Sequence, residues 1–240
     1  MTNLNILYED NHIIVVVKPN NILSQADNTK DVDMITLIKK YIKEKYNKPG
    51  EAYLGLVHRL DRPVSGIMVF AKTSKAASRL SKQIRDNKLK KTYLAVVNGT
   101  FDNKKGILEN FIEKCKDNSS KIVNQGGKYA KLSYEVVEEN KKDNLTLLKV
   151  NLETGRHHQI RVQFANIGHP LYGDQRYGKQ DKNQIALHAY RLEFTHPTTK
   201  ELLVFESYPP KKSGWIFFKN VKWHCKDENR LLFSSFFVII

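Results

Sequence analysis

Residues 58–66 of the chain have the sequence HRLDRPVSG. One aspartate, Asp61, stands between Arg59 and Arg62, and the proline and glycine that follow predict a turn. We expect the two guanidinium groups to lie against the carboxylate and to favour its ionised form. A positioned carboxylate can act as a nucleophile, and guanidinium groups match phosphate oxygens. The stretch therefore offers a candidate reactive group and a candidate contact to a polyanion, although ordinary surface turns can have the same pattern.

The charge balance points to a polyanionic partner. The chain has 240 residues, with 40 Lys and Arg against 25 Asp and Glu, for a formal net charge of +15. Nucleic acid is the first partner that such an excess indicates, and an anionic membrane surface is the second. Eight basic residues and the single acid Asp86 lie between residues 72 and 91. This segment includes Lys82 and Arg85, which we expect to contact phosphates.

The cysteines and the two ends of the chain indicate a protein of the cytoplasm. Cys115 and Cys225 are far apart and form no CxxC pair, so a reducing compartment is expected and a structural disulfide or zinc knuckle is not. The first residues lack a basic and apolar signal sequence. Residues 231–240 are apolar but too few to span a membrane, which takes roughly 20. This segment could be a buried strand, a hydrophobic tail or a frameshift product, and no membrane association is expected.

Hydrophobic periodicity predicts an α+β fold, namely a large mixed, mainly antiparallel sheet with about three helices. Helices are expected over residues 34–48, 74–87 and 156–167, with Ser74 as an N-cap. Strands are expected over residues 13–17, 66–71, 89–97, 107–115, 129–137, 145–152, 185–194 and 202–207. We assign residues 1–210 to one catalytic domain and residues 211–240 to a C-terminal extension whose structure the sequence does not define.

Residues 154–161, TGRHHQIR, form the second candidate segment. On the expected helix, Arg161 would lie near His157 and His158, which precede it by four and three positions. Adjacent helical residues diverge by about 100°, so these two histidines are not placed to chelate one metal ion. We expect no metal, with one histidine facing RNA and the other packed inside.

A third segment, residues 90–97, predicts a strand on which Tyr93 and Leu94 face opposite ways. Taken alone, Tyr93 is an ordinary core tyrosine. The sequence contains no P-loop, no GxGxxG after a strand and no GxSxG, so no cofactor is expected and a serine hydrolase is disfavoured.

Five motifs together resemble the RluA-type RNA pseudouridine synthases, and they occur in that family's order over about residues 5 to 210. They are HRLDRPVSG at 58–66, KTYLAVVNG at 91–99, ETGRHHQIRVQ at 153–163, GHPLYGDQRYG at 168–178 and LHAYRLEFTHP at 187–197.

The resemblance implies cofactor-free isomerisation of uridine in structured RNA, most often large-subunit ribosomal RNA and sometimes transfer RNA. It implies that Asp61, Tyr93 and Arg161 are catalytic and that Leu187 lines the uracil pocket. We expect Arg59 to fill the space that the flipped base leaves or to pair with RNA. Arg62, Arg156 and His158 are further expected RNA or substrate contacts. The protein is expected to act as a monomer.

Two alternatives stay open at this point. A non-catalytic RNA-binding or ribosome-assembly protein would keep the basic surface but could lose Asp61, Tyr93 or Arg161. A metal phosphohydrolase could instead use His58, Asp61, His157 and His158, and its activity would be lost on chelation.

Overall fold

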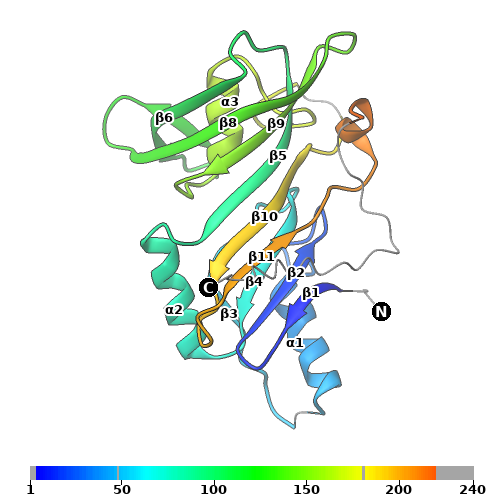
Figure 1. Ribbon diagram of the computed structural model, residues 1–240, viewed down its shortest axis with the longest axis vertical. Coiled ribbons are helices and arrows are strands. Elements are labelled where there is room, and N and C mark those ends of the chain that lie inside the picture. Colours follow the sequence, from blue (N-terminus) through cyan, green and yellow to red (C-terminus); the bar gives the residue numbers. More distant parts are fainter. Residues whose placement is uncertain (1–3, 48, 180–181, 220–240) are drawn as a thin grey trace, which may run out of the picture.

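One large curved sheet organises the chain in the computed structural model, which describes residues 4–47, 49–179 and 182–219 (Figure 1). Its eleven strands follow the order β1-β2-β4-β10-β5-β9-β8-β6-β7, with β11 paired to β10 and β3 paired to β4. The strands are β1 (Asn5–Glu9), β2 (Ile13–Lys18), β3 (Gly55–Leu56), β4 (Ser65–Ala71), β5 (Lys90–Asn98), β6 (Lys105–Lys114), β7 (Ser120–Val123), β8 (Lys128–Asn140), β9 (Leu145–Leu152), β10 (Leu187–Thr195) and β11 (Leu202–Glu206). The predicted α+β class with a mixed, mainly antiparallel sheet is confirmed, while β1, β3 and β7 were not foreseen.

Three α-helices accompany the sheet: α1 (Met34–Lys45), α2 (Ser74–Arg85) and α3 (Gln159–Asn166). The carboxylate of Asp33 caps α1 by accepting a hydrogen bond from the backbone N–H of Thr36. The N-cap of α2 is Thr73, whose hydroxyl accepts from the N–H of Ala76, so the prediction that Ser74 caps this helix was wrong by one residue. Thr73 has the extended backbone that an N-cap requires.

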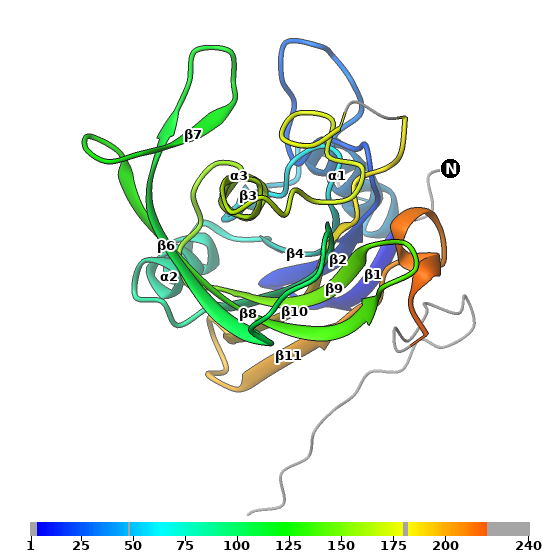
Figure 2. The same cartoon turned by 90° about the horizontal axis from the view of Figure 1, so that it is seen from above.

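Helices α1 and α2 pack on opposite faces of the same two strands. Ile14 and Val16 of β2 lie in one core cluster with the buried face of α1, whereas Ile13 and Val15 lie in a second cluster with Ala76 and Leu80 of α2. Because both faces of β2 and β4 are covered, these strands are continuous apolar runs rather than alternating ones. Viewed from above, α1, β3 and α3 occupy the concave side of the curved sheet (Figure 2).

A parallel contact between β4 and β10 joins the two halves of the sheet, with Ser65 opposite His188 and Gly66 opposite Ala189. Gly66 has a φ of 125°, and a Cβ at this position would collide with the backbone of Ala189. Only glycine combines that conformation with that approach. The glycine of the HRLDRPVSG stretch therefore serves the sheet junction rather than the turn, contrary to the expectation from sequence.

Glu9, at the end of β1, joins three elements through its carboxylate. Its side chain is 6% exposed and accepts hydrogen bonds from Lys45 and Lys72, each at 2.7 Å, and from Tyr41 and Tyr46, each at 2.9 Å. Burial alone would raise the pKa of Glu9, but these four donors outweigh it and lower the pKa to about 2.

Glu9 should therefore make stability depend on pH in acid. Since its pKa is lower in the folded than in the unfolded chain, the stabilisation is complete above about pH 4.5 and is lost as the pH falls towards 2. Glu9→Gln should cost about 2 kcal/mol at pH 7, less than the full shift because Lys45 is partly exposed, and much less at pH 2.5. Urea unfolding at both pH values measures this difference. The control Glu44→Gln, on an exposed pair with Lys40, should have little effect, and an equal cost of Glu9→Gln at both pH values would contradict the account.

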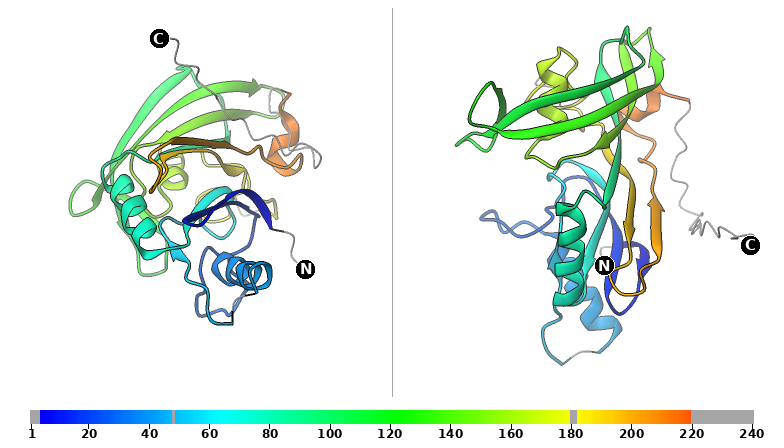
Figure 3. Two further views of the ribbon diagram at one scale, coloured as in Figure 1. Left: turned by 60° about the horizontal axis from the view of Figure 1, so that its bottom comes forward. Right: turned by 60° about the vertical axis from the view of Figure 1, so that its left-hand side comes forward.

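The start of the predicted C-terminal extension packs onto the sheet. A short 3₁₀ helix covers Ser213–Phe217, and Trp215 and Phe218 are buried in a cluster with Leu94 and Val96 of β5. The apolar residues 231–240 lie outside the described residues. In the described ranges, no helix is long and apolar enough to cross a membrane. Strands β6 and β7 lie at the end of the strand order, and their hairpin projects away from the rest of the molecule (Figure 3).

Candidate active site

A cleft of about 1750 Å³ opens on the concave side of the sheet. It is lined by segments far apart in sequence, including residues 56–64, the end of α2, β5, residues 152–161, residues 173–176 and residues 182–185. The lining residues include nine Lys or Arg and four Asp or Glu. This volume exceeds the roughly 300–1,000 Å³ of a small-molecule site. Size and charge together suit a segment of a polyanion.

Asp61 begins a tight turn on the cleft wall, in which the N–H of Val64 donates to the carbonyl of Asp61 at 3.0 Å. The turn is fixed through its backbone carbonyls. Nζ of Lys18 donates to the carbonyl of Arg62 at 3.0 Å and also to those of Pro19 and Ile22. The side chain of Asp61 remains 29% exposed to the cleft.

Further side chains hold neighbouring carbonyls of the same turn. Asn20 and Gln184 each donate an amide hydrogen to the carbonyl of Pro63 at 2.8 Å, and the hydroxyl of Ser24 donates to the carbonyl of Leu60 at 2.7 Å. The consequence is a reactive carboxylate on an immobilised backbone, as a preorganised site requires. The sequence analysis did not predict any of these supports. For Lys18, the one available indication was a lysine directly before a proline at the end of an apolar strand.

Lys18 is completely buried at the end of β2. Burial lowers the pKa of Lys18 to about 7, although the nearby charge of Asp61 acts in the opposite direction. The charged form has three N–H groups, one for each of the three carbonyls, so the site is built for an ammonium.

The arginines beside Asp61 in sequence do not hold its carboxylate, and that expectation was wrong. Nη1 of Arg62 pairs with the carboxylate of Asp31 at 2.8 Å, and Arg59 is exposed at the cleft. Consecutive residues of a tight turn point in diverging directions, so charges adjacent in sequence need not meet. Both arginines line the cleft and remain predicted RNA contacts.

Arg161, which is 100 positions away in sequence, is the partner of Asp61. Its Nη1 donates to Oδ2 of Asp61 at 3.3 Å. Its Nε and Nη2 both bind the carboxylate of Asp174, each at 2.8 Å, and this second pairing was not foreseen. Asp174 is fully buried and also accepts the backbone N–H groups of Arg176 and Tyr177. The bidentate pair fixes the plane of the guanidinium and aims its remaining nitrogen at Asp61.

The environments of Arg161 and Asp174 keep both groups charged. Burial would lower the pKa of Arg161, but the hydrogen bonds and charge of Asp174 raise it. Burial likewise would raise the pKa of Asp174, and Arg161 with the two backbone N–H groups lowers it. The aspartate of the sequence GDQRYG was the available signal for this pairing.

Helix α3 begins at Gln159, three residues later than predicted. The side chain of Gln159 explains the difference, because its oxygen accepts from the hydroxyl of Thr154 and the N–H of Arg156, while its amide donates to the carbonyl of Lys131. These bonds hold residues 154–158 as a loop. His158 then has a left-handed φ of 53°.

The two histidines therefore lie in the loop before α3, and the predicted helix face with Arg161 does not exist. Their rings stack at 3.8 Å. Nδ1 of His157 bonds Ser120, and Nδ1 of His158 bonds the hydroxyl of Tyr177. Burial lowers the pKa of His158 to about 4, although the charge of Asp61 acts in the opposite direction, so His158 is neutral at pH 7. Its Nε2 lies 3.6 Å from Oδ2 of Asp61.

The phosphohydrolase alternative has no matching geometry in the described part of the chain. No three His, Cys, Asp or Glu side chains there are grouped to hold a metal ion. Nε2 of His58 accepts the backbone N–H of Val69, and the other two rings are engaged as described above.

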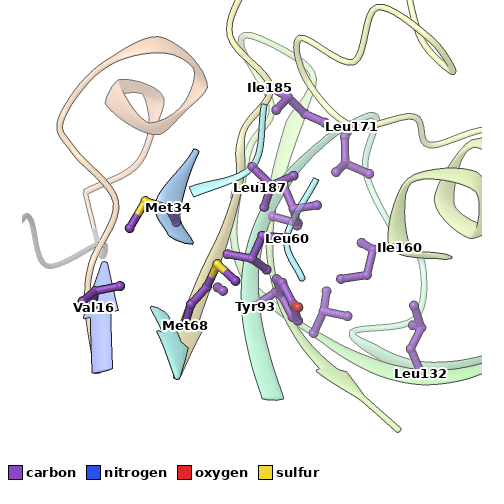
Figure 4. Packing of buried hydrophobic residues seen from close by; sticks show 14 of the residues in the cluster. Val16, Met34, Leu60, Met68, Tyr93, Leu132, Ile160, Leu171, Ile185 and Leu187 are labelled. Atoms are coloured by element: carbon purple, nitrogen blue, oxygen red, sulfur yellow. The ribbon is translucent and has the colours of Figure 1, made fainter. Parts of the chain in front are cut away.

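Apolar side chains line the same cleft as the carboxylate of Asp61. Tyr93 of β5 lies among Leu60, Ile160 and Leu187, and all four residues line the cleft (Figure 4). Burial first and the charge of Asp61 second raise the pKa of Tyr93, so its phenol stays protonated at neutral pH. The predicted site residues Asp61, Tyr93, Arg161 and Leu187 are thus brought together.

The remaining predicted RNA contacts differ in position. Arg156 is exposed at the cleft and donates to the carbonyl of Tyr129. Arg85, at the end of α2, lines the cleft, whereas Lys82 is exposed one turn earlier and is not among the lining residues. Two other basic residues near this helix serve the fold, since Lys72 pairs with Glu9 and Arg79 donates to the carbonyl of Pro197.

Neutralising α2 should weaken the salt dependence of RNA binding. Arg85→Gln should lower the magnitude of the slope of log K against log salt by about 1, and the double variant with Lys82→Gln by up to about 2. Lys82 should contribute no more than Arg85, because it lies outside the cleft. Filter binding across a salt series gives the slope, with Lys40→Gln on α1 as the control. An unchanged slope in the double variant would show that α2 does not face the RNA.

Comparison with known proteins gives a consistent family match. Residues 12–166 match the family model described as RNA pseudouridylate synthase. The uncharacterized RNA pseudouridine synthase YhcT of Bacillus subtilis is 38% identical over 208 residues, which cover 85% of this chain and 68% of the relative. The ribosomal large subunit pseudouridine synthase D of Nitrosomonas europaea is 36% identical over 219 residues, which cover 86% of this chain and 62% of the relative.

The fold is also shared with solved structures. Human RNA Pseudouridylate Synthase Domain Containing 4 superposes with a TM-score of 0.73 at 20% identity, covering 89% of this chain and 90% of that one. Human RNA Pseudouridylate Synthase Domain Containing 1 gives a TM-score of 0.69 at 24% identity, covering 87% and 84%.

Proposed function

Because the chain belongs to the RNA pseudouridylate synthase family and is an isomerase that acts on RNA, we propose that it converts uridine to pseudouridine in large-subunit ribosomal RNA with Asp61 as its catalytic carboxylate. One observation carries the proposal. A partly exposed carboxylate on an immobilised turn faces a guanidinium that Asp174 holds in place, beside an apolar surface that suits a base. The name of the Nitrosomonas relative supports the choice of ribosomal RNA.

The reaction needs no external atoms or electrons. The bond between N1 of uracil and C1′ of ribose breaks, the ring turns, and a bond from C5 to C1′ forms; C5 then loses its proton and N1 gains one. Asp61 can serve as a nucleophile, or it can remove a sugar proton on the way to a glycal. In either route Arg161 holds the carboxylate in position, and the apolar surface retains the detached base. We propose that no cofactor takes part.

The target base must leave its stack to reach Asp61, which costs a few kcal/mol. Tyr93 offers the detached base an aromatic face, and Leu187 adds apolar surface in the same cleft. Arg59, exposed beside the reactive turn, is positioned to occupy the space that the base leaves.

Tyr93→Phe separates stacking from proton transfer. The ring remains, so RNA binding should stay within about twofold of the parent. If the hydroxyl moves a proton, the single-turnover rate should fall by about 10²-fold or more. Tyr93→Leu should weaken binding as well. Release of tritium from uridine labelled at C5 measures the rate, and an unchanged rate for Tyr93→Phe would leave Tyr93 as a stacking surface alone.

The proposed substrate is tested with two unmodified transcripts, large-subunit ribosomal RNA and a pool of transfer RNAs, each labelled with tritium at C5 of uridine. The wild-type protein should release tritium from the ribosomal transcript, in the absence of added cofactor and in the presence of a chelator. Chemical mapping then locates the pseudouridine. Release from the transfer RNA pool alone would overturn the choice of RNA, and release from neither transcript would overturn the proposed substrate class.

A further inference from the structure

Lys91 of β5 lines the cleft two residues before Tyr93, and its charge has no counterpart among the residues that the structure describes. Its side chain is partly buried and lines the cleft. Within the described ranges it makes no hydrogen bond and no ion pair, whereas Arg161 is held by two carboxylates. Burial lowers the pKa of Lys91. An ammonium that has lost part of its hydration without gaining an anion is costly, so the site is incomplete without a negative ligand.

His58, another residue that lines the cleft, also has a donor without a partner in the described part of the chain. Its Nε2 accepts the N–H of Val69 at 3.0 Å, so the neutral ring carries its proton on Nδ1. That N–H is buried and has no acceptor among the residues that the structure describes. Burial first and the charge of Lys91 second lower the pKa of His58 to about 3. Both cleft residues thus carry a donor that has no acceptor among the described residues.

The position of Lys91 along β5 indicates which anion it takes. Lys91 and Tyr93 are two residues apart on β5, so they lie on the same face of the strand, and both line the cleft. Two residues along a strand cover about 7 Å, roughly the length of one nucleotide. Farther along the same wall, Arg85 and Asn87 continue the lining. Nζ of Lys91 lies next to Gly155, where an added Cβ would come within 3.2 Å of it.

From these observations we infer that Lys91 binds the phosphate of the nucleotide adjacent to the target uridine, one step from the base that stacks on Tyr93. This inference rests on the proposed function, because it takes RNA as the ligand. A uracil carbonyl would supply a dipole, whereas the unpaired ammonium calls for a full negative charge, and phosphate is the anion that RNA provides. The phosphate would fix the register of the strand in the cleft and so position the uridine at Asp61.

The chain offers a matched control. Lys90 precedes Lys91 in β5, is exposed, and is not among the lining residues. Lys90→Met and Lys91→Met remove the same charge from opposite faces of one strand, and Lys91→Arg keeps a charge at the site. The probe is the unmodified large-subunit ribosomal transcript, on which the wild-type protein must first form pseudouridine; if it does not, the proposed function fails rather than this inference.

Interference by phosphate ethylation identifies phosphates whose neutralisation weakens binding. Ethylation of one phosphate within a nucleotide of the modified uridine should weaken binding by the wild-type protein, Lys90→Met and Lys91→Arg. It should not weaken binding by Lys91→Met. Lys91→Met should also bind about tenfold more weakly, with a salt slope lowered by about 0.7–0.9. An interference pattern and slope equal to those of wild type would overturn the inference.

A measurement on the wild-type protein covers the case in which Lys91→Met does not fold. Lysines are acylated with and without saturating ribosomal transcript, and the products are quantified by mass spectrometry. RNA should lower the labelling of Lys91 at least fivefold and that of Lys90 by less than twofold. Equal labelling of Lys91 with and without RNA would overturn the inference.

Discussion

Asp61→Asn should abolish pseudouridine formation while the protein stays folded and continues to bind RNA. The amide nearly matches the carboxylate in size, and the turn that carries it is held through backbone carbonyls rather than through this side chain. An amide is neither a nucleophile nor a base here, so we expect the single-turnover rate to fall on the order of 10⁴-fold or more. Tritium release under excess enzyme measures the loss.

Asp31→Asn is the matched control for this substitution, because Asp31 is an exposed carboxylate that pairs with Arg62 beside the same turn. It should lower the rate by no more than a few fold. Substantial residual turnover by Asp61→Asn in a preparation free of wild-type protein would refute the assignment of Asp61.

Arg161→Met should be costly in two separable ways. The fully buried carboxylate of Asp174 loses both side-chain hydrogen bonds, which should reduce the free energy of unfolding by about 3–5 kcal/mol. Asp61 loses the group that positions it, which should lower the single-turnover rate by at least about 10²-fold.

The double variant Arg161→Met/Asp174→Asn distinguishes the two effects. The amide oxygen of the asparagine can still accept the N–H groups of Arg176 and Tyr177, and no buried charge remains unpaired. We expect urea unfolding to show most of the stability restored, while the rate stays as low as in the single variant. Recovery of both the stability and the single-turnover rate would mean that Arg161 acts on stability alone.

The sequence predicted the parts of the fold that depend on local pattern. The β-branched run in β2 and the apolar residues of β5 and β9 identified these strands to within a residue or two, because the burial of these side chains determines where the strands lie. The start of α3 was misplaced because the side chain of Gln159 competes for the backbone of the preceding loop, a contact that periodicity does not encode.

The residues of the candidate site were predicted mainly because the sequence motifs resemble those of a family, and less from the chemistry of the individual side chains. Asp61, Tyr93, Arg161 and Leu187 do meet at one cleft. The supports of Asp61 and Arg161 were missed, since Lys18 and Asp174 act on groups that topology alone brings near. The expected clamp by Arg59 and Arg62 failed for the same reason, because adjacency in sequence is a poor guide to which charges meet across a turn.

The parallel contact between β4 and β10 has a kinetic consequence. It joins Ser65 to His188, so that more than half of the described chain lies between two paired residues. Contacts of such large sequence separation are slow to form, because the entropy of closing the loop is lost before the contact contributes. The turn of Asp61 leads into one of these strands, and Leu187 begins the other. The site is therefore assembled by a long-range step in folding, and neither half of the chain holds a functioning fragment of it while synthesis is under way.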